Sequence, residues 1–463
     1  MTGNCLKSRR FWFTLAALFI LVTGILAGAR ARRGSNDFDT FYAAGQAVWQ
    51  KQGIYYQGEY YSTPGNKGPF LYAPAAAIFF ALFAILPQFL AAFVYNAFTF
   101  FLFCGSLGLI FRLLAIPDPV FFLKTAWQRD RLSVLAAAAL TAALLLDNLI
   151  MAQANPIVFF LCLASLALVQ KNKPFLAGMP LAFAVLMKLT PLLFVVYFAL
   201  RRKGKVVLAA GIWALLFTAG IPSLVFGPNQ NRIYHQQWLG RMIKPAITAF
   251  KAEKEKDETH PLKRSVAAYK ADALTSLLTE KNQALQGALT RLFLKDRNRY
   301  AHEGDYPIHV IERYEKLPVL LGGFPPETLG VGVKGLVGLL FLLYLILLVT
   351  GGGGLGKGDA FETNAIALTF LSLTLFSPLA RSHQFIAWVF PLIVYLQTMA
   401  PKTRAASLLF FLASALYLLQ GLPLGKAAGL GAWANLLFWL LFFRQAVLQT
   451  AIFPTSGKLT GRC

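Results

Sequence analysis

Charged residues are scarce in this sequence. Asp, Glu, Lys and Arg make up 14% of the 463 residues, whereas hydrophobic residues make up 57%. Soluble domains carry about a quarter of their residues as charges, so the composition excludes an ordinary soluble protein. Apolar runs at 11–28 and 335–349 approach the roughly 20 residues that a helix needs to cross a bilayer. We therefore expect an all-α polytopic membrane protein.

Cysteines and acidic residues are also few. Two of the 4 cysteines lie in apolar runs and two near the ends of the chain, which excludes a disulfide framework and zinc-site spacing. The 20 acidic residues face 44 Lys and Arg, giving a net charge of +24. The cations cluster between apolar runs, as is typical of cytoplasmic loops beside anionic headgroups. We therefore expect a lipid bilayer, and no nucleic acid, as a partner.

The basic clusters also predict the path of the chain. The first apolar helix, 11–28, leaves the cytoplasm, so 29–89 becomes the first external loop. The N-terminus resembles a signal peptide, but its apolar run is long for one and three arginines follow it, so we expect a retained helix. Within the loop, the apolar stretch 72–87 is short and bounded by prolines, which predicts a shallow or re-entrant helix.

The stretch 174–200 has basic clusters on both sides, so it must leave the cytoplasm and return within 27 residues. Two full spans need roughly 40 residues. We expect two short helices joined at "KLTP" (188–191), where Pro191 disfavours helix at Thr190. The other expected spans are 90–114, 131–149, 155–170, 206–226, 333–350, 360–376, 385–399, 405–422 and 429–447.

The total is about 12 transmembrane helices, divided into three parts. Residues 1–226 form an N-terminal transmembrane module, and 333–463 form a C-terminal one. Between them, 227–332 is expected to be a long, partly helical external loop with 16 basic and 12 acidic residues. This loop is predicted either to bind an anionic acceptor or to cover the protein without touching substrate.

Polar side chains gather on the predicted external side. Each has a structural explanation: carboxylates pair with Arg32 or Arg33, amides cap helices, and lysines reach the headgroups. Together they are more informative, because ionisable groups at membrane depth are costly. The candidates are Asp37 and Asp39 in "NDFDTFY", Gln153 and Asn155 in "AQAN", Lys188 in "KLTP", and Arg381 and His383 in "SPLARSHQF".

A carboxylate and cations facing a lipid wall suit the transfer of a sugar from a polyprenyl phosphate. The reaction needs a base for the acceptor hydroxyl, which contributes typically about 10²–10⁴ in rate. It also needs cations beside the departing phosphate. Asp37 or Asp39 supplies the first, and Lys188, Arg381 and His383 the second. No metal or other cofactor is required, although a divalent ion bridging Asp37 and Asp39 stays an alternative.

The ordered motifs resemble glycosyltransferase family 87. They are "DFDTFYAAGQAV" with "GIYY" (37–56), "FLYAP" (70–74), "AQAN" (152–155), "KLTP" (188–191) and "SPLARSHQF" (377–385). The resemblance implies a GT-C-type fold with juxtamembrane helices in the first external loop. It also implies an inverting transferase of the external face of a bacterial cytoplasmic (inner) membrane, using a polyprenyl-phosphate sugar, with mannose expected.

The resemblance also implies roles for single residues. Asp37 matches the family's acidic position and is the expected catalytic base, with Asp39 second. Lys188, Arg381 and His383 are expected to bind the donor phosphate. The expected substrate-binding residues are Tyr42, Tyr72, Gln153 and Asn155. Two departures stand out: Ala152 replaces a glycine before Gln153, and Arg381 replaces a tryptophan, which leaves the identity of the sugar open.

Other functions stay open at this point. A flippase or transporter of polyprenyl-linked sugars also needs phosphate-binding cations, but it needs no base. A polymer ligase with an undecaprenyl-diphosphate donor relies on Arg and His in an external loop, as Arg381 and His383 would supply. A structural scaffold gives no reason for the ordered motifs. The expected acceptor is a glycolipid or glycan.

Overall fold

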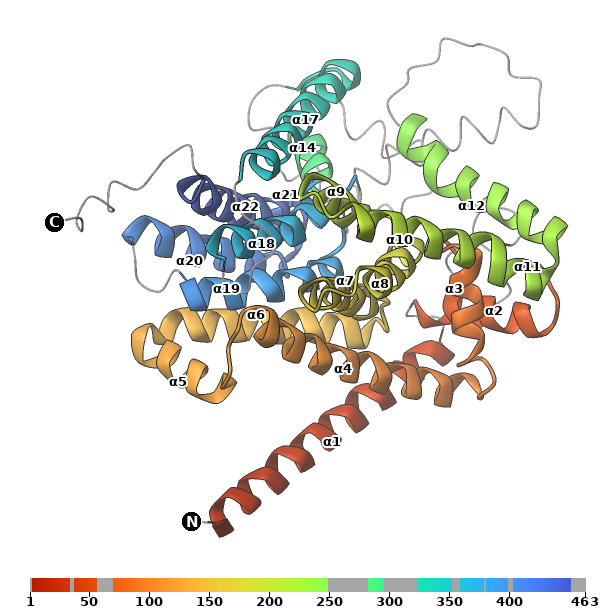
Figure 1. The fold of residues 1–463 in the computed structure, drawn as a ribbon, viewed down its shortest axis with the longest axis horizontal. Helices are drawn as coiled ribbons and strands as arrows, with labels where there is room; N and C mark the ends of the chain where they lie inside the picture. The colour runs from red at the N-terminus through yellow and green to blue at the C-terminus, as the bar shows by residue number, and fades with distance from the viewer. Residues whose placement is uncertain are drawn as a thin grey trace. The chain divides into compact units, whose positions relative to one another are not determined.

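The computed structural model describes residues 2–33, 37–55, 70–248, 282–294, 323–351, 359–378, 380–398 and 403–450. These residues form helices and connecting turns, with an isolated bridge between Leu294 and Phe324 (Figure 1). In chain order the elements are α1 (Thr2–Arg32), α2 (Phe38–Trp49), α3 (Pro74–Ala81), α4 (Gln88–Leu113), α5 (Pro119–Arg129), α6 (Arg131–Ile150), α7 (Asn155–Gln170), α8 (Pro174–Met187), α9 (Leu192–Leu200), α10 (Gly204–Leu215), η1 (Leu216–Gly220), α11 (Ile221–Phe226), α12 (Pro228–Thr248), α14 (Leu285–Phe293), α17 (Pro326–Thr350), α18 (Ala360–Leu375), η2 (Ser382–Trp388), α19 (Val389–Thr398), α20 (Arg404–Leu419), α21 (Pro423–Ala428) and α22 (Leu430–Leu448).

Long apolar helices make this a helical membrane protein. Among the described residues, 5 stretches are long and apolar enough to cross a bilayer: Gln88–Leu113, Arg131–Ile150, Gly204–Phe226, Thr328–Thr350 and Leu430–Leu448. Shorter apolar helices cover Asn155–Gln170, Pro174–Met187, Ala360–Leu375 and Arg404–Leu419. Most helix ends lie within two residues of those predicted, and the total of about 12 spans stays a prediction.

The predicted break at "KLTP" is confirmed. Helix α8 ends at Met187, Lys188 has an extended backbone with φ −150° and ψ 138°, and α9 begins at Leu192. Pro191 explains the break, because its ring disfavours a helical conformation at the residue before it. The break separates Lys188 from both apolar helices.

The short apolar stretch in the first loop forms α3, which has 8 residues. At 1.5 Å per residue it is roughly 12 Å long, so it does not cross a bilayer. It packs closely against α2. A Cβ atom on Gly45 would lie 2.8 Å from the backbone carbon of Phe80, so this approach requires glycine.

Two local features were not predicted. The stretch 204–226 contains a π-helical turn, η1, just before Pro222. Proline removes a backbone donor from a helix, and a π turn accommodates such a loss. The basic stretch after α4 also forms a helix, α5. Its N-cap residue is Asp118, whose side chain accepts hydrogen bonds from Val120 N and Phe121 N.

The described chain forms two compact units. The first comprises residues 1–109, 143–191 and 208–239, and the second comprises 110–142, 192–207 and 240–463. In the first unit, α3 packs against α2, α8 and α11, and α7 packs against α8. In the second, α22 packs against α18 and α20, and α14 against α17. The predicted division at 226 and 332 concerns membrane topology and stays a prediction.

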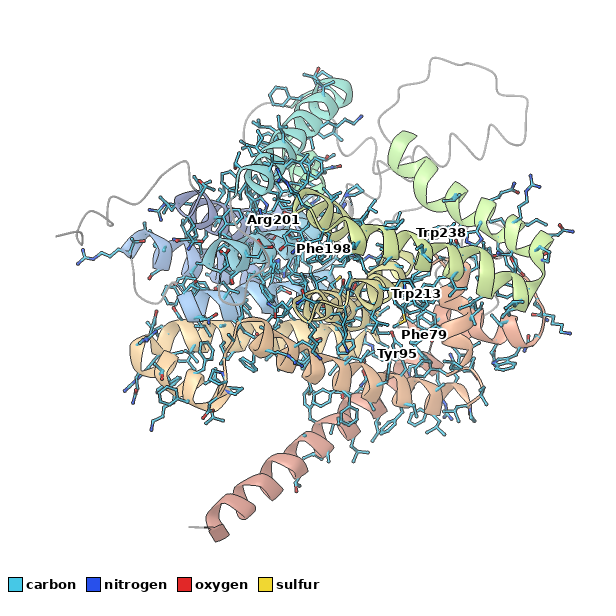
Figure 2. The ribbon with its side chains drawn as sticks, viewed as in Figure 1. Phe79, Tyr95, Phe198, Arg201, Trp213 and Trp238 are labelled. Carbon is cyan, nitrogen blue, oxygen red and sulfur yellow. The ribbon has the colours of Figure 1, made fainter. Side chains whose placement is uncertain are left out.

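Aromatic side chains pack against one another in each unit, and Figure 2 labels Phe79, Trp213 and Phe198 among them. In the first unit, the ring centroid of Phe79 lies 5.7 Å from that of Phe183. The indole of Trp213 donates to the Phe175 carbonyl over 3.1 Å. In the second unit, Trp388 is fully buried and donates to Asn435 Oδ1 over 3.1 Å. The buried Trp388 N–H thus has a partner in its apolar surroundings, as buried indoles require.

Candidate active site

Asp37 stands directly before α2 in the first unit. Aspartate at this position usually caps its own helix, but here the side chain makes no cap hydrogen bond. Instead its Oδ2 atom accepts a hydrogen bond from Nε2 of Gln153, and its backbone N–H donates to the Met151 carbonyl over 3.2 Å. Asp37 is therefore held by the "AQAN" turn, more than a hundred residues along the chain.

That turn is shaped by a left-handed residue. Ala152 has φ +48°, and the Gln153 N–H donates to the Asn148 carbonyl over 2.9 Å, which closes the end of α6. Glycine is usual at such a position, because a Cβ atom costs about 1–2 kcal/mol there. The family's glycine at this place thus has a conformational reason, and Ala152 keeps the turn at some cost.

The chain of hydrogen bonds continues to Lys188. Nδ2 of Asn155 lies 3.4 Å from Oε1 of Gln153 and 3.1 Å from Oδ1 of Asn148. The Lys188 ammonium donates to Oδ1 of Asn155 over 2.5 Å. Gln153 and Asn155 are 1% and 5% exposed, whereas Asp37 and Lys188 at the two ends are half-buried. A carboxylate and a cation are thus joined through two buried amides.

The "FLYAP" segment lies at the same end of the first unit. The Ala73 N–H donates to the Leu186 carbonyl over 3.4 Å, two residues before Lys188. The backbone carbonyl of Tyr72 accepts a hydrogen bond from the Tyr55 hydroxyl over 2.5 Å. The ring of Tyr72 packs edge-on against Phe41, with 5.2 Å between the ring centroids. The substrate-binding role predicted for Tyr72 stays a prediction.

Asp39 has a different environment from Asp37. It is 5% exposed, and its Oδ1 accepts a hydrogen bond from Gln88 over 3.3 Å. Its Oδ2 has no hydrogen-bond partner among the described residues. The pKa of Asp39 is raised to about 7, mainly by burial; the Gln88 hydrogen bond opposes this rise and the nearby Asp37 adds to it. A carboxyl of this kind is partly protonated at neutral pH, whereas the half-buried Asp37 is better placed to meet substrate.

Tyr42 packs within the first unit. Its hydroxyl donates to the Leu86 carbonyl over 2.9 Å and accepts from Gln46 over 3.1 Å. Its ring lies 6.1 Å from that of Phe38. Burial raises the pKa of the Tyr42 hydroxyl, and the Gln46 hydrogen bond lowers it. These contacts give Tyr42 a packing role, and its predicted contact with substrate stays a prediction.

Arg381 and His383 lie in the second unit. Arg381 is exposed and precedes the 3-10 helix η2, in which His383 is 6% exposed. Asn282, within the predicted long loop, donates from Nδ2 to the Pro378 carbonyl over 3.1 Å and accepts at Oδ1 from Ala380 N over 3.2 Å. The loop therefore fixes the "SPLARSHQF" turn. Within the loop predicted to be partly helical, residues 285–293 form α14, and residues 249–281 lie outside those that the structure describes.

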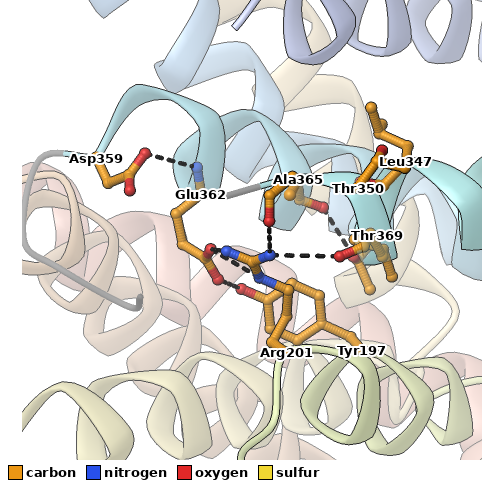
Figure 3. A network of polar contacts seen from close by, with 10 residues as sticks. Tyr197, Arg201, Leu347, Thr350, Asp359, Glu362, Ala365 and Thr369 are labelled. Carbon is orange, nitrogen blue, oxygen red and sulfur yellow. Dashed lines mark hydrogen bonds and ion pairs between the residues drawn. The ribbon is translucent and has the colours of Figure 1, made fainter. Parts of the chain in front are cut away.

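A second polar network is buried in the second unit (Figure 3). The Arg201 guanidinium forms an ion pair with Glu362 at 2.6 Å, and the Tyr197 hydroxyl donates to the same carboxylate. Arg201 also donates to the Gly351 carbonyl over 2.6 Å. The two charged side chains are 5% and 3% exposed, so the network joins α9, α17 and α18 rather than meeting a substrate.

Several residues of these networks were missed from the sequence. Asn148 and Gln88 support Asn155 and Asp39, yet each is a single amide near the end of an apolar helix. The cost of polar side chains in apolar spans is the signal that could have singled out Asn148. Within the described ranges, no group of three or more His, Cys, Asp or Glu side chains is placed to hold a metal ion. The absence of a metal stays a prediction.

Comparison with known proteins bears on this geometry. Residues 70–253 match the model of glycosyltransferase family 87. Over this region the predicted family resemblance is confirmed. The family 87 region contains Gln153, Asn155 and Lys188, whereas Asp37, Asp39, Arg381 and His383 lie outside it. No solved structure matches the chain.

Two curated relatives carry one name, polyprenol-phosphate-mannose-dependent alpha-(1-2)-phosphatidylinositol mannoside mannosyltransferase. The protein from Mycolicibacterium smegmatis is 32% identical over 172 residues, which cover 36% of this chain and 38% of that protein. The protein from Mycobacterium tuberculosis is 26% identical over 315 residues, which cover 65% of this chain and 64% of that protein. The matched stretches thus span less than two thirds of each relative.

Proposed function

We propose that this protein is a membrane mannosyltransferase that uses a polyprenyl-phosphate-mannose donor. The observation that carries the proposal is the hydrogen-bond chain from Asp37 through Gln153 and Asn155 to Lys188. The chain joins a carboxylate and a cation, the two groups that the reaction requires. The family 87 region and the names of the two relatives support the donor and the reaction class.

In the proposed mechanism, Asp37 is the general base. Its Oδ2 is occupied by the Gln153 amide, whereas Oδ1 accepts no hydrogen bond from the described residues and is left for the acceptor hydroxyl. The acceptor oxygen attacks the anomeric carbon, the bond from that carbon to the phosphate oxygen breaks, and the hydroxyl proton passes to Asp37. The displacement is single and inverts the anomeric carbon.

Lys188 stabilises the departing phosphate in this mechanism. Its half-buried ammonium hydrogen-bonds to Asn155, and its positive charge and N–H donors suit phosphate oxygens. The phosphate-binding roles expected of Arg381 and His383 stay predictions. The acceptor is a mannolipid of the phosphatidylinositol mannoside class, as the names of the relatives suggest. We propose that the reaction takes place on the external face of a bacterial cytoplasmic membrane, in a fold with about 12 transmembrane helices.

The test is transfer by purified protein in liposomes. Polyprenyl-phosphate-mannose carrying labelled mannose is supplied with a mannolipid acceptor, against a matched polyprenyl-diphosphate sugar. We expect labelled product from the monophosphate donor alone. Transfer from the diphosphate donor alone would support the ligase instead, and movement of donor across the bilayer without transfer would support a flippase. Right-side-out and inside-out membrane vesicles, supplied with a water-soluble acceptor, test the face.

A further inference from the structure

The C-terminal end of α1 carries a cluster of exposed cations that the proposed reaction has not used. Arg30, Arg32 and Arg33 are all exposed there. In the predicted topology this end of α1 is external, where loops carry few cations. The helix dipole stabilises a cation near a helix C-terminus, but neighbouring like charges repel one another. The helix dipole therefore explains one arginine better than three.

Arg32 and Arg33 have no carboxylate partner within the described parts of the chain, where the ion pair present is Arg201–Glu362. The nearby acids, Asp37 and Asp39, accept hydrogen bonds from amides instead. The Arg32 guanidinium lies 5.0 Å from the centroid of the Phe89 ring, in a cation–π contact that orients it at the start of α4. The exposed guanidinium groups of Arg32 and Arg33 are therefore available to bind an anion.

The cluster is joined to the acidic segment by one side chain. Nε2 of Gln88 donates to the Ala31 carbonyl over 3.1 Å and to Oδ1 of Asp39 over 3.3 Å. Ala31 stands between Arg30 and Arg32, and α1 reaches α4 at this end (Figure 1). The buried Oδ2 of Asp39 has no hydrogen-bond partner in the described structure, so one polar atom beside Gln88 is left unsatisfied.

We propose that Arg32 and Arg33, with Arg30 beside them, bind the phosphodiester of an anionic mannolipid acceptor. This inference rests on the proposed function and names the part of the acceptor that the protein recognises. Guanidinium groups suit phosphate oxygens because their N–H donors bind in pairs. A lipid-anchored phosphodiester lies at the membrane surface, which is where α1 ends in the predicted topology.

The geometry favours the acceptor over the donor. In an inverting displacement the attacking hydroxyl and the leaving phosphate lie on opposite sides of the anomeric carbon. Asp37 marks the side of the hydroxyl, and Lys188 marks the side of the phosphate. The arginine cluster is connected through Gln88 to Asp39, two residues from Asp37, and so belongs to the acceptor side.

The test uses two acceptors in liposomes of uncharged lipid. One is a phosphatidylinositol mannoside and the other an uncharged alkyl mannoside. In the double variant Arg32→Gln/Arg33→Gln we expect KM for the anionic acceptor to rise about 10-fold or more, as loss of charge-assisted hydrogen bonds predicts. KM for the uncharged acceptor and for the donor should stay within about 2-fold. The matched control, Lys171→Gln/Lys173→Gln, removes two exposed cations from the same unit and should behave as wild type.

Each other outcome has a distinct meaning. An equal rise in KM for both acceptors, a rise in donor KM, or the same loss in the lysine control would overturn the inference while the proposed function stands. An effect seen only when anionic phospholipid without mannose is added would assign the cluster to bulk lipid and also overturn it. Wild-type protein that transfers to neither acceptor would overturn the proposed function itself. If the glutamine variant does not fold, the variant Arg32→Lys/Arg33→Lys replaces it. In that lysine variant, a ratio of the two acceptors' KM values equal to that of wild type would count against paired guanidinium contacts.

Discussion

Gln153 provides the sharpest test of how Asp37 is held. The change Gln153→Met keeps the length of the side chain but removes both the N–H donor and the carbonyl acceptor. Asp37 then loses the hydrogen bond to Oδ2, and Asn155 loses its contact with Oε1. The backbone bond from Asp37 to the Met151 carbonyl stays, so the segment keeps its place while the carboxylate rotates freely.

The expected magnitude follows from the kind of bond that is lost. A hydrogen bond to a charged group contributes about 1.5–3 kcal/mol. If that energy orients the base in the transition state, kcat falls roughly 10-fold to 150-fold, since about 1.4 kcal/mol corresponds to a factor of ten. The donor does not touch Gln153 in the proposed mechanism, so donor KM should change by less than about 3-fold.

The assay is release of polyprenyl phosphate by purified protein, with kcat and KM measured separately for donor and acceptor. The matched control is Gln128→Met, at an exposed glutamine of α5, which should leave kcat unchanged. A thermal unfolding midpoint near that of wild type shows that the variant is folded. A folded Gln153→Met protein with wild-type kcat would refute the claim that Gln153 positions the base.

Three further predictions concern stability. Burial raises the pKa of Asp39 from 3.8 to about 7, so the folded state binds a proton more tightly than the unfolded chain. The thermal unfolding midpoint should therefore fall as pH rises from about 4 to about 7 and then level off. In Asp39→Asn the midpoint should fall less steeply with pH. Glu362→Gln leaves Arg201 buried without a charged partner and should lower the free energy of unfolding by about 3–5 kcal/mol. The double variant Arg201→Met/Glu362→Met should be less destabilised. Equal stability of wild type and Glu362→Gln would contradict the network. Ala152→Gly relieves a left-handed alanine and should raise stability by up to about 1 kcal/mol, whereas a lower unfolding midpoint would show that φ +48° carries no strain.

The helices were predictable because few structures satisfy the backbone hydrogen bonds of a long apolar run within a bilayer. The stop at "KLTP" followed from Pro191 and from the basic clusters on either side. Helix α5 was missed because its stretch read as a basic loop, although Asp118 is a usual helix cap. Arg201 was likewise interpreted as a loop cation, and the structure buries it against Glu362.

For the candidate site, the sequence predicted the residues but not their partners. Gln153, Asn155 and Lys188 came from ordered motifs, and the structure joins them to Asp37. Gln88 and Asn148 carry no motif, since a single amide in an apolar helix has many uses. The difference between Asp37 and Asp39 depends on burial, which arises only when α2 packs in the folded unit.

The central claim is that Asp37 is the base of a mannosyl transfer from a polyprenyl phosphate. The most direct measurement compares polyprenyl phosphate release by wild type, Asp37→Asn, Asp39→Asn and the control Asp118→Asn, with polyprenyl-phosphate-mannose and a mannolipid acceptor. We predict that Asp37→Asn alone loses roughly 10²-fold or more in kcat, as loss of a general base implies. Folded Asp37→Asn protein that releases polyprenyl phosphate at the wild-type rate would contradict the account.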